Sequence, residues 1–492
     1  MAYTTIDKHS SHFEISQWAG DGGTQNITNH NFQPDRILLK SRATGDGWSL
    51  QDSVRGFGST TKLSPYDGSG PNDASGGSWG NYGYLSQALA NGFTTVAGST
   101  PGQNNKSGNN YVGYSQLAGG TAPTQTYTVK VVSDSGNKYR FDDFGTSAVT
   151  LDLQEGGTYT FDSSDSTVNS HPFVLGTSSG VDGSYSTGVT YKLDGVTKTY
   201  SQYTSGFSSA TSRQLIITVA ASAPTLYYNC SVHSGMGGQI NTNSTFGSSN
   251  FDGTIKSVVS HNSAAGFSII KYNGTGSGGA TIGHELGNKP AFIMFKNLDA
   301  NVDWRVYHHR TSGTGSEGDG TRTYRLNSND YYNTDNSPLN DTRPGDSVVT
   351  LGSSTSTNAN GQEHVAYCWI EKVGFSKFGI YEGNYSSDGV FVYTGFKPEL
   401  VIVKKKAANG SWRMFDSVRA DGENPADKWL DAHSNSGGVG ATDVQADLLF
   451  SGFKLRDAAN AFNTDGSDYL YMAWGQTLVG GDSNQNIPAT AR

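Results

Sequence analysis

The sequence predicts an all-β protein built from several sandwich domains. Its 492 residues exceed the length of one ordinary domain. Glycine accounts for 64 residues, and serine, threonine and asparagine are frequent, a composition typical of many short strands joined by tight turns. Aromatic residues make up 11% of the chain, which argues against a disordered protein because aromatic side chains supply large buried areas.

An internal repeat organises most of the chain. Three copies of one pattern place a lysine six residues, and a tryptophan fourteen residues, after a proline. The copies are Pro34/Lys40/Trp48, Pro290/Lys296/Trp304 and Pro398/Lys404/Trp412. Three matches at identical spacing indicate a repeat. The apolar run between each proline and lysine suits a buried strand, so we expect each copy to form a jelly-roll-like β-sandwich of about 100 residues.

Charged residues follow two of the repeated tryptophans. The first and third copies continue into Asp-Ser-Val-Arg, at Asp52–Arg55 and Asp416–Arg419, whereas the middle copy carries His308 and Arg310 there. An active site built three times with altered residues is implausible. We therefore expect a surface or turn-bracing ion pair, and we expect the repeated tryptophans and prolines to shape the core.

A different pattern occupies the chain between the first and second copies. Apolar and polar residues alternate in successive short runs, which predicts strands. His171 follows these strands, and Cys230, His233 and Met236 follow a later strand at intervals of three residues. A thiolate, two imidazoles and a weak thioether suit copper in both oxidation states. The spacing therefore raises the question of a copper site at Cys230, His233 and Met236.

The order of these elements resembles the cupredoxin family over residues 126–243, and the short Cys-x2-His-x2-Met loop resembles its amicyanin-like members. The resemblance implies a Greek-key β-sandwich and a type 1-like copper site with four metal ligands: His171, Cys230, His233 and Met236. Gly235, Gly237 and Gly238 allow the loop to turn back sharply. Pro172 departs from the family pattern, because blue copper proteins commonly use the amide of that residue to bond the cysteine sulfur and proline has no N–H. A vestigial site that no longer binds copper is therefore the alternative.

Together the repeats and the insert predict four domains. These are β-sandwich repeat 1 over residues 1–120, the cupredoxin-like domain over 125–244, a connector with repeat 2 over 245–377, and repeat 3 over 378–492. The predicted fold class is thus all-β, with three related sandwich repeats and a cupredoxin-like Greek-key sandwich inserted after the first.

Several functions are disfavoured by composition and motifs. The net charge of −9 disfavours nucleic-acid binding, because phosphate neutralisation needs a basic face. No apolar stretch approaches the roughly 18–20 residues that span a bilayer. Cys230 and Cys368 cannot form a disulfide framework, and the N-terminal segment has no secretory pattern, so we expect synthesis in a reducing cytoplasm. No nucleophile elbow, phosphate loop, HExxH motif or carboxylate pair is visible, so we do not expect an enzyme.

The whole layout resembles a family of repeat-domain proteins found in tailed bacteriophages, particularly phages of marine cyanobacteria and other marine bacteria. The resemblance rests on the repeat "GFKPELVIVKKK…SWRMFDSVR", the connector over residues 250–296, the "CSVHSGMGG" insert and the terminal "NIPATAR". It implies a virion structural protein, a tail-fibre or tail-appendage subunit involved in host attachment. A capsid decoration or fibre protein, a copper electron-transfer protein and a glycan-binding array are the alternatives.

The same resemblance implies the partners. We expect other virion proteins, a homo-oligomer for which a trimer is our guess, and a host surface glycan. Two polar loops rich in tyrosine, residues 76–85 and 327–337, are candidate contact loops, with plain solvated loops as the alternative.

Overall fold

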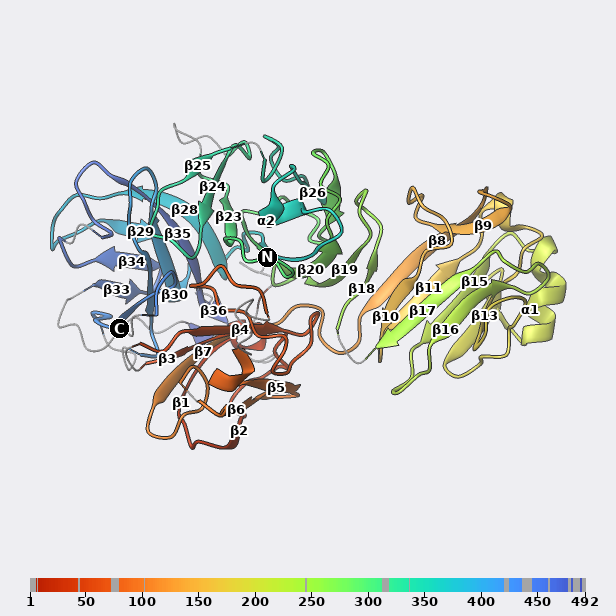
Figure 1. Cartoon of the computed structure of the whole chain (residues 1–492), viewed down its shortest axis with the longest axis horizontal. Coiled ribbons are helices and arrows are strands. Elements are labelled where there is room, and N and C mark those ends of the chain that lie inside the picture. Colours follow the sequence, from red (N-terminus) through yellow and green to blue (C-terminus); the bar gives the residue numbers. More distant parts are fainter. Residues whose placement is uncertain are drawn as a thin grey trace. The chain divides into compact units, whose positions relative to one another are not determined.

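The computed structural model describes residues 6, 8–42, 45–71, 79–100, 102–243, 246–311, 318–335, 337–419, 424–435, 445–458, 461–476, 479–480 and 487–488. Strands make up 43% of the structure and helices 5%, which confirms the predicted all-β class. The chain divides into two compact units (Figure 1). Unit 1 contains residues 1–118, 261–280 and 284–492, and unit 2 contains residues 119–260 and 281–283. Unit 1 thus holds the three repeats, apart from the connector up to residue 260 and residues 281–283, which belong to unit 2.

The elements carried by the three repeats follow in chain order. In repeat 1 they are η1 (His9–Ser11), β1 (Phe13–Ala19), β2 (Thr24–Ile27), β3 (Arg36–Ser41), β4 (Trp48–Asp52), η2 (Trp79–Tyr82), β5 (Tyr84–Leu89), β6 (Gly92–Val96) and β7 (Asn110–Gln116). In repeat 2 they are β20 (Phe267–Asn273), β21 (Thr281–Gly283), β22 (Phe292–Asn297), β23 (Arg305–His308), β24 (Arg322–Arg325), β25 (Asn333–Thr334), β26 (Val348–Thr350), α2 (Thr355–Asn358) and β27 (Glu363–Trp369). In repeat 3 they are β28 (Ser376–Glu382), β29 (Phe391–Tyr393), β30 (Lys397–Lys405), β31 (Trp412–Asp416), β32 (Trp429–Asp431), β33 (Ala446–Leu449), β34 (Gly452–Leu455) and β35 (Asp468–Gln476), followed by β36 (Val479–Gly480) and β37 (Ile487–Pro488).

One strand order recurs in the main sheet of every repeat. The orders are β1-β7-β3-β4 in repeat 1, β20-β27-β22-β23 in repeat 2 and β28-β35-β30-β31 in repeat 3. Repeats 1 and 3 each add a second sheet, β2-β6-β5 and β29-β34-β33. The repeat predicted from the Pro-Lys-Trp spacing is therefore a repeat of topology as well.

The apolar run of each repeat is buried on both faces of its strand. All six residues of β3 are buried. Ile37 and Leu39 join the core of repeat 1 with Phe93 and Tyr111, whereas Leu38 on the opposite face lines a cavity among the three repeats. Burial on both sides explains why these strands read as continuous apolar runs and do not alternate.

The repeated tryptophans link the repeats in a closed cycle. Each indole N–H donates to a backbone carbonyl of a neighbouring repeat. The pairs are Trp48 to Asp431 (3.1 Å), Trp304 to Ser64 (3.1 Å) and Trp412 to Arg325 (2.9 Å). Repeat 1 therefore binds repeat 3, repeat 2 binds repeat 1, and repeat 3 binds repeat 2, so the three repeats form a ring.

The repeated lysines follow the same cycle. Each ammonium donates to a carbonyl that lies four residues after the tryptophan's acceptor. These pairs are Lys40 to Asn435 (3.3 Å), Lys296 to Gly68 (2.6 Å) and Lys404 to Asn329 (2.9 Å). Each lysine also donates to the carbonyl six residues ahead in its own repeat, at Asp46, Val302 or Gly410. Each lysine thus fixes its own turn and a neighbouring loop together.

The repeated ion pairs belong to the same interfaces. Arg55 Nε lies 2.5 Å from Asp52 Oδ2, and their side chains are 4% and 0% exposed, so the pair braces a turn as expected but is buried and not on the surface. Tyr367 of repeat 2 donates to Asp52 at 2.7 Å, and Tyr114 of repeat 1 donates to Asp416 at 2.8 Å. At the remaining interface, His308 takes the place of the aspartate and donates to the carbonyl of Tyr471 at 3.3 Å.

Unit 2 is the inserted β-sandwich. Its elements are β8 (Thr124–Ser133), β9 (Asn137–Phe141), β10 (Leu151–Gln154), β11 (Thr158–Asp162), η3 (Ser166–Val168), β12 (Phe173–Gly176), β13 (Val189–Leu193), β14 (Val196–Lys198), α1 (Tyr200–Gly206), η4 (Phe207–Ser209), β15 (Arg213–Thr218), β16 (Leu226–Cys230), β17 (Gly238–Asn243) and β18 (Ser248–Asn250), with β19 (Ser257–Asn262) at its end. Two sheets, β10-β17-β16-β12 and β14-β13-β15-β11-β8-β9, enclose one aromatic core. Each sheet contains one parallel pair, β10 with β17 and β8 with β11, as crossing connections between the sheets require.

The buried lysines make the free energy of unfolding of unit 1 depend on pH. Burial lowers the pKa of Lys40 and Lys296 to about 8 and that of Lys404 to about 7. A lysine in the unfolded chain titrates near 10.4, so between pH 7 and 10 the unfolded state binds more protons. The free energy of unfolding should therefore rise with pH in this window, by up to about 1.4 kcal/mol per pH unit for each lysine.

Urea unfolding of wild type and Lys404→Met at pH 7 and pH 9 measures this effect. All eight tryptophans lie in unit 1, so their fluorescence reports its unfolding alone. Lys404→Met should show a smaller rise than wild type, and Lys289→Met, which changes an exposed lysine, should match wild type. Equal rises in wild type and Lys404→Met would contradict the prediction.

Candidate metal centre

Strand register brings three of the predicted ligands together in unit 2. Cys230 is the last residue of β16, and His233 lies in the loop that follows. Strand β12 pairs with β16 so that Phe173 lies opposite Cys230. His171, two residues before Phe173, therefore reaches the same end of the sheet although it lies far away in the sequence.

The three donor atoms converge closely. His171 Nδ1 lies 3.1 Å from His233 Nδ1, and Cys230 Sγ lies 3.6 Å from His233 Nδ1 and 3.9 Å from His171 Nδ1. Metal bonds of about 2.0 Å to nitrogen and about 2.3 Å to sulfur place the donors of a trigonal site roughly 3.5–3.8 Å apart. The spacing of the three atoms therefore fits a metal ion held by two imidazoles and a thiolate.

Burial differs among the three side chains and changes the pKa of His171. Cys230 is fully buried, His171 is 8% exposed and His233 is exposed. Burial, reinforced by the neighbouring His233, lowers the pKa of His171 below its ordinary value. His171 is therefore neutral near pH 7 and keeps a nitrogen lone pair for a metal.

Backbone amides of the loop donate hydrogen bonds to the cysteine sulfur. The N–H groups of Val232 and His233 both point at Cys230 Sγ, at 3.5 and 3.4 Å. Pro172 has no N–H to contribute, and its carbonyl instead accepts from Ser231 N at 3.0 Å, which ties the two ligand segments together. The loop thus supplies two donors in place of the amide that Pro172 lacks.

Glycines close the loop as their positions predicted. Gly235 has a φ of +75°, a conformation that other residues rarely adopt. A Cβ on Gly237 would lie 1.6 Å from the carbonyl oxygen of Tyr228, so only glycine fits there. Met236, between them, is 2% exposed and packs in the same core cluster as Cys230.

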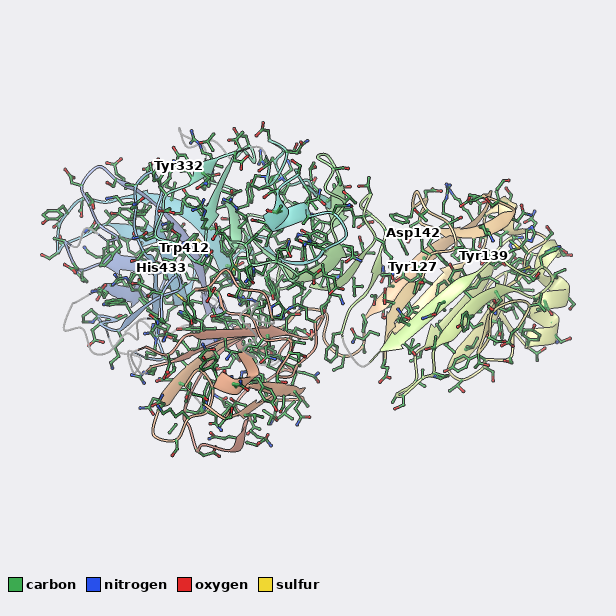
Figure 2. The ribbon with its side chains drawn as sticks, viewed as in Figure 1. Tyr127, Tyr139, Asp142, Tyr332, Trp412 and His433 are labelled. Atoms are coloured by element: carbon green, nitrogen blue, oxygen red, sulfur yellow. The ribbon has the colours of Figure 1, made fainter. Side chains whose placement is uncertain are left out.

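Strand β9 forms hydrogen bonds to both segments that carry the predicted ligands, a role that the sequence did not reveal. Tyr139, labelled in Figure 2, donates from its hydroxyl to the carbonyl of His171 at 2.8 Å and from its amide to the carbonyl of Met236 at 2.9 Å. Asn137 Nδ2 lies 3.5 Å from His171 Nε2, and Lys138 donates to the carbonyl of Gly235. Residues 137–139 therefore position both ligand segments, and no spacing pattern links them to the ligands.

The other candidates are less convergent. Among the residues that the structure describes, His171, Cys230 and His233 form the one group of three or more His, Cys, Asp or Glu side chains placed to share a metal ion. Cys368 is buried in β27, and burial raises the pKa of its thiol. In the two contact loops, Tyr82 is 42% exposed and Tyr331 is 50% exposed, whereas residues 76–78 and 336 lie outside the described residues.

Comparison with known proteins matches the repeats and the two ends of the insert, but not its ligand-bearing middle. A family model described as "Domain of unknown function (DUF7483)" matches residues 8–140 and 241–477. The segment between them, 141–240, contains all four predicted ligands. No curated protein matches the chain. Within the described residues, no helix is long and apolar enough to cross a membrane.

Copper titration tests the site. Adding copper(II) to the full-length protein should give one bound equivalent and an intense visible absorption from the thiolate–copper bond. Cys230→Ser should abolish this absorption, and Cys368→Ser should retain it because Cys368 lies in another unit. A colourless protein without stoichiometric copper would show that the site is vestigial.

Proposed function

The chain belongs to the DUF7483 family, and we propose that it is a bacteriophage virion protein, a tail-appendage subunit for host attachment that carries a copper-binding domain. The closed ring of repeats carries the structural part of this proposal. The lysines, tryptophans and aspartates that recur in the repeats form hydrogen bonds across the interfaces between repeats. These residues therefore hold the ring together. A rigid scaffold suits an appendage that must transmit load.

Exposed tyrosines support a role in attachment. Tyr82 and Tyr331 project from the two predicted contact loops, and repeat 3 adds Tyr385, Phe391 and Tyr393. Exposed aromatic side chains offer rigid contact area at low entropic cost, and they suit the apolar faces of sugars. A host surface glycan is therefore the proposed ligand, and other virion proteins are the proposed partners.

A homotrimer remains part of the proposal. Because the ring of unit 1 already joins three sheets within one chain, a trimer would form through surfaces other than the braced interfaces. Light scattering after gel filtration measures the state directly: a mass three times that of one chain supports the trimer, and the mass of one chain rejects it.

Copper binding is a second function that the convergence of His171, Cys230 and His233 favours. These residues would hold the ion, and copper bound by them supplies one-electron exchange. Within unit 2, the loop amides and strand β9 keep the donor atoms in place whether or not the rest of the chain attaches to a host.

Immunogold labelling of purified particles tests the virion proposal. Label at the tail is expected, label over the head would favour capsid decoration, and unlabelled particles would reject the virion role.

Particles carrying Tyr331→Ala should adsorb to host cells at a clearly lower rate, because the exposed ring is lost. Val373→Ala, which changes another exposed apolar side chain, is the matched control and should adsorb normally. Equal adsorption of both variants and wild type would remove the 327–337 loop from the attachment surface.

A further inference from the structure

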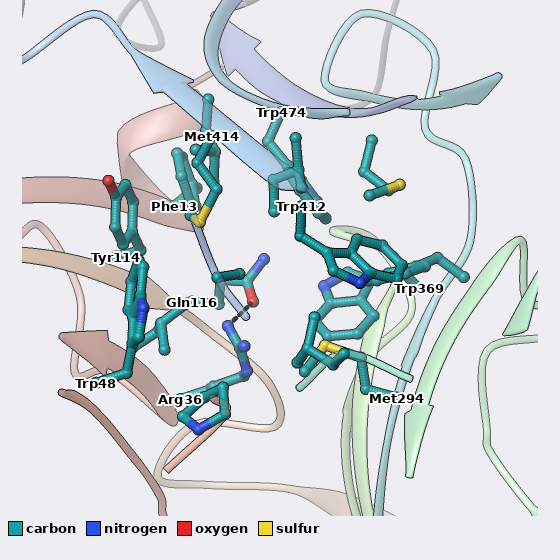
Figure 3. Close-up of a pocket in the computed structure, with 18 residues that line it drawn as sticks. Phe13, Arg36, Trp48, Tyr114, Gln116, Met294, Trp369, Trp412, Met414 and Trp474 are labelled. Carbon is teal, nitrogen blue, oxygen red and sulfur yellow. Dashed lines mark hydrogen bonds between the residues drawn. The ribbon is translucent and has the colours of Figure 1, made fainter. Parts of the chain in front are cut away.

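A central cavity lies where the three repeats of unit 1 meet (Figure 3). Its volume is about 40 Å³, and its walls are mostly aromatic and aliphatic. Equivalent cross-strand pairs from the three repeats face it. These pairs are Arg36 with Gln116, Phe292 with Trp369, and Leu400 with Trp474. Repeat 1 alone places a charged residue at this position.

Arg36 is buried in this apolar setting with part of its hydrogen-bonding capacity unused. Its side chain donates from Nη1 to Gln116 Oε1 at 3.1 Å, the bond drawn in Figure 3. Its Nε–H has no partner among the described residues, and neither has the indole Nε1–H of Trp369. The guanidinium carbon lies 5.3 Å from the centroid of the Trp369 ring. Two buried donors that lack acceptors therefore line one cavity, and leaving such donors unbonded is costly.

The guanidinium of Arg36 lies over the rings of Tyr367 and Trp369, each at 5.3 Å, but it has no ion-pair partner among the described residues. Asp52, a nearby carboxylate, already accepts from Arg55 at 2.5 Å and from Tyr367 at 2.7 Å. The charge of Asp52 favours the protonated form of Arg36, but the ion pair of Asp52 is with Arg55. Burial lowers the pKa of Arg36 only to about 10, so the guanidinium is charged at neutral pH. Arg36 forms no ion pair with a carboxylate among the described residues.

We propose that the central cavity binds a small inorganic monovalent anion of the chloride class, held by Arg36 Nε–H and Trp369 Nε1–H. The volume is several times the roughly 10–15 Å³ that a water molecule needs, and it is far too small for a sugar or a nucleotide. Water would satisfy the donors but leave the charge without a counter-ion in a medium of low dielectric constant. An anion satisfies both, and it joins repeat 1 to repeat 2 at the centre of the ring.

Thermal unfolding in chloride and in gluconate at equal ionic strength tests this site. Tryptophan fluorescence follows unit 1 alone, since every tryptophan lies there. The melting temperature of wild type should be higher in chloride, by roughly 2 °C or more once chloride reaches about ten times its Kd. Arg36→Leu should lose this difference, and it should fold because Leu400 occupies the equivalent position in repeat 3. Arg42→Gln, in the same unit, should keep it.

Crystals grown in bromide give an independent readout. An anomalous peak in the central cavity is expected for wild type and for Arg42→Gln, and no peak is expected for Arg36→Leu. Equal melting temperatures of wild type in the two salts, a chloride effect that survives in Arg36→Leu, or a wild-type cavity without an anomalous peak would each overturn the proposal.

Discussion

Unit 1 depends on the hydrogen bonds that the lysine and the tryptophan of each repeat donate to a neighbouring repeat. Lys404 and Trp412 donate to carbonyls only four residues apart in repeat 2, and the other two interfaces repeat this geometry. Each buried ammonium has at least one acceptor in its own repeat and another in the neighbouring loop, so displacing that loop leaves a buried charge with fewer hydrogen bonds, which is costly. We therefore expect the three interfaces to stabilise one another, because the ring closes where the third repeat binds the second.

The metal centre depends on a separate set of contacts. Its ligands come from the ends of β12 and β16, and strand β9 ties both segments to the sandwich through Tyr139. Every one of these elements belongs to unit 2. The family match stops at residue 140 and resumes at residue 241, so the segment that carries the ligands lies outside the matched residues. Scaffold and metal chemistry are thus built from different residues of the same chain.

Sequence patterns predicted what depends on local spacing. The Pro-Lys-Trp interval identified the repeats, and the interval between Cys230 and His233 predicted a shared site. The acceptors of the ring could not be predicted, because Ser64, Arg325 and Asp431 contribute backbone carbonyls that any residue type provides. The Asp-Ser-Val-Arg spacing predicts an ion pair of Asp52 that lies at the surface or braces a turn; the pair braces a turn, and packing against Tyr367 of another repeat buries it. Contacts between distant segments follow from register and ring closure, which no single segment encodes.

Amide hydrogen exchange measured by mass spectrometry on Lys296→Met tests the central claim most directly. Exchange should be faster in β3, β22 and β30 together, because the loss of one lysine brace weakens the whole ring, and it should be unchanged in β16 of unit 2. Faster exchange confined to repeat 2 would show that the repeats are independent sandwiches, and this result would contradict the account.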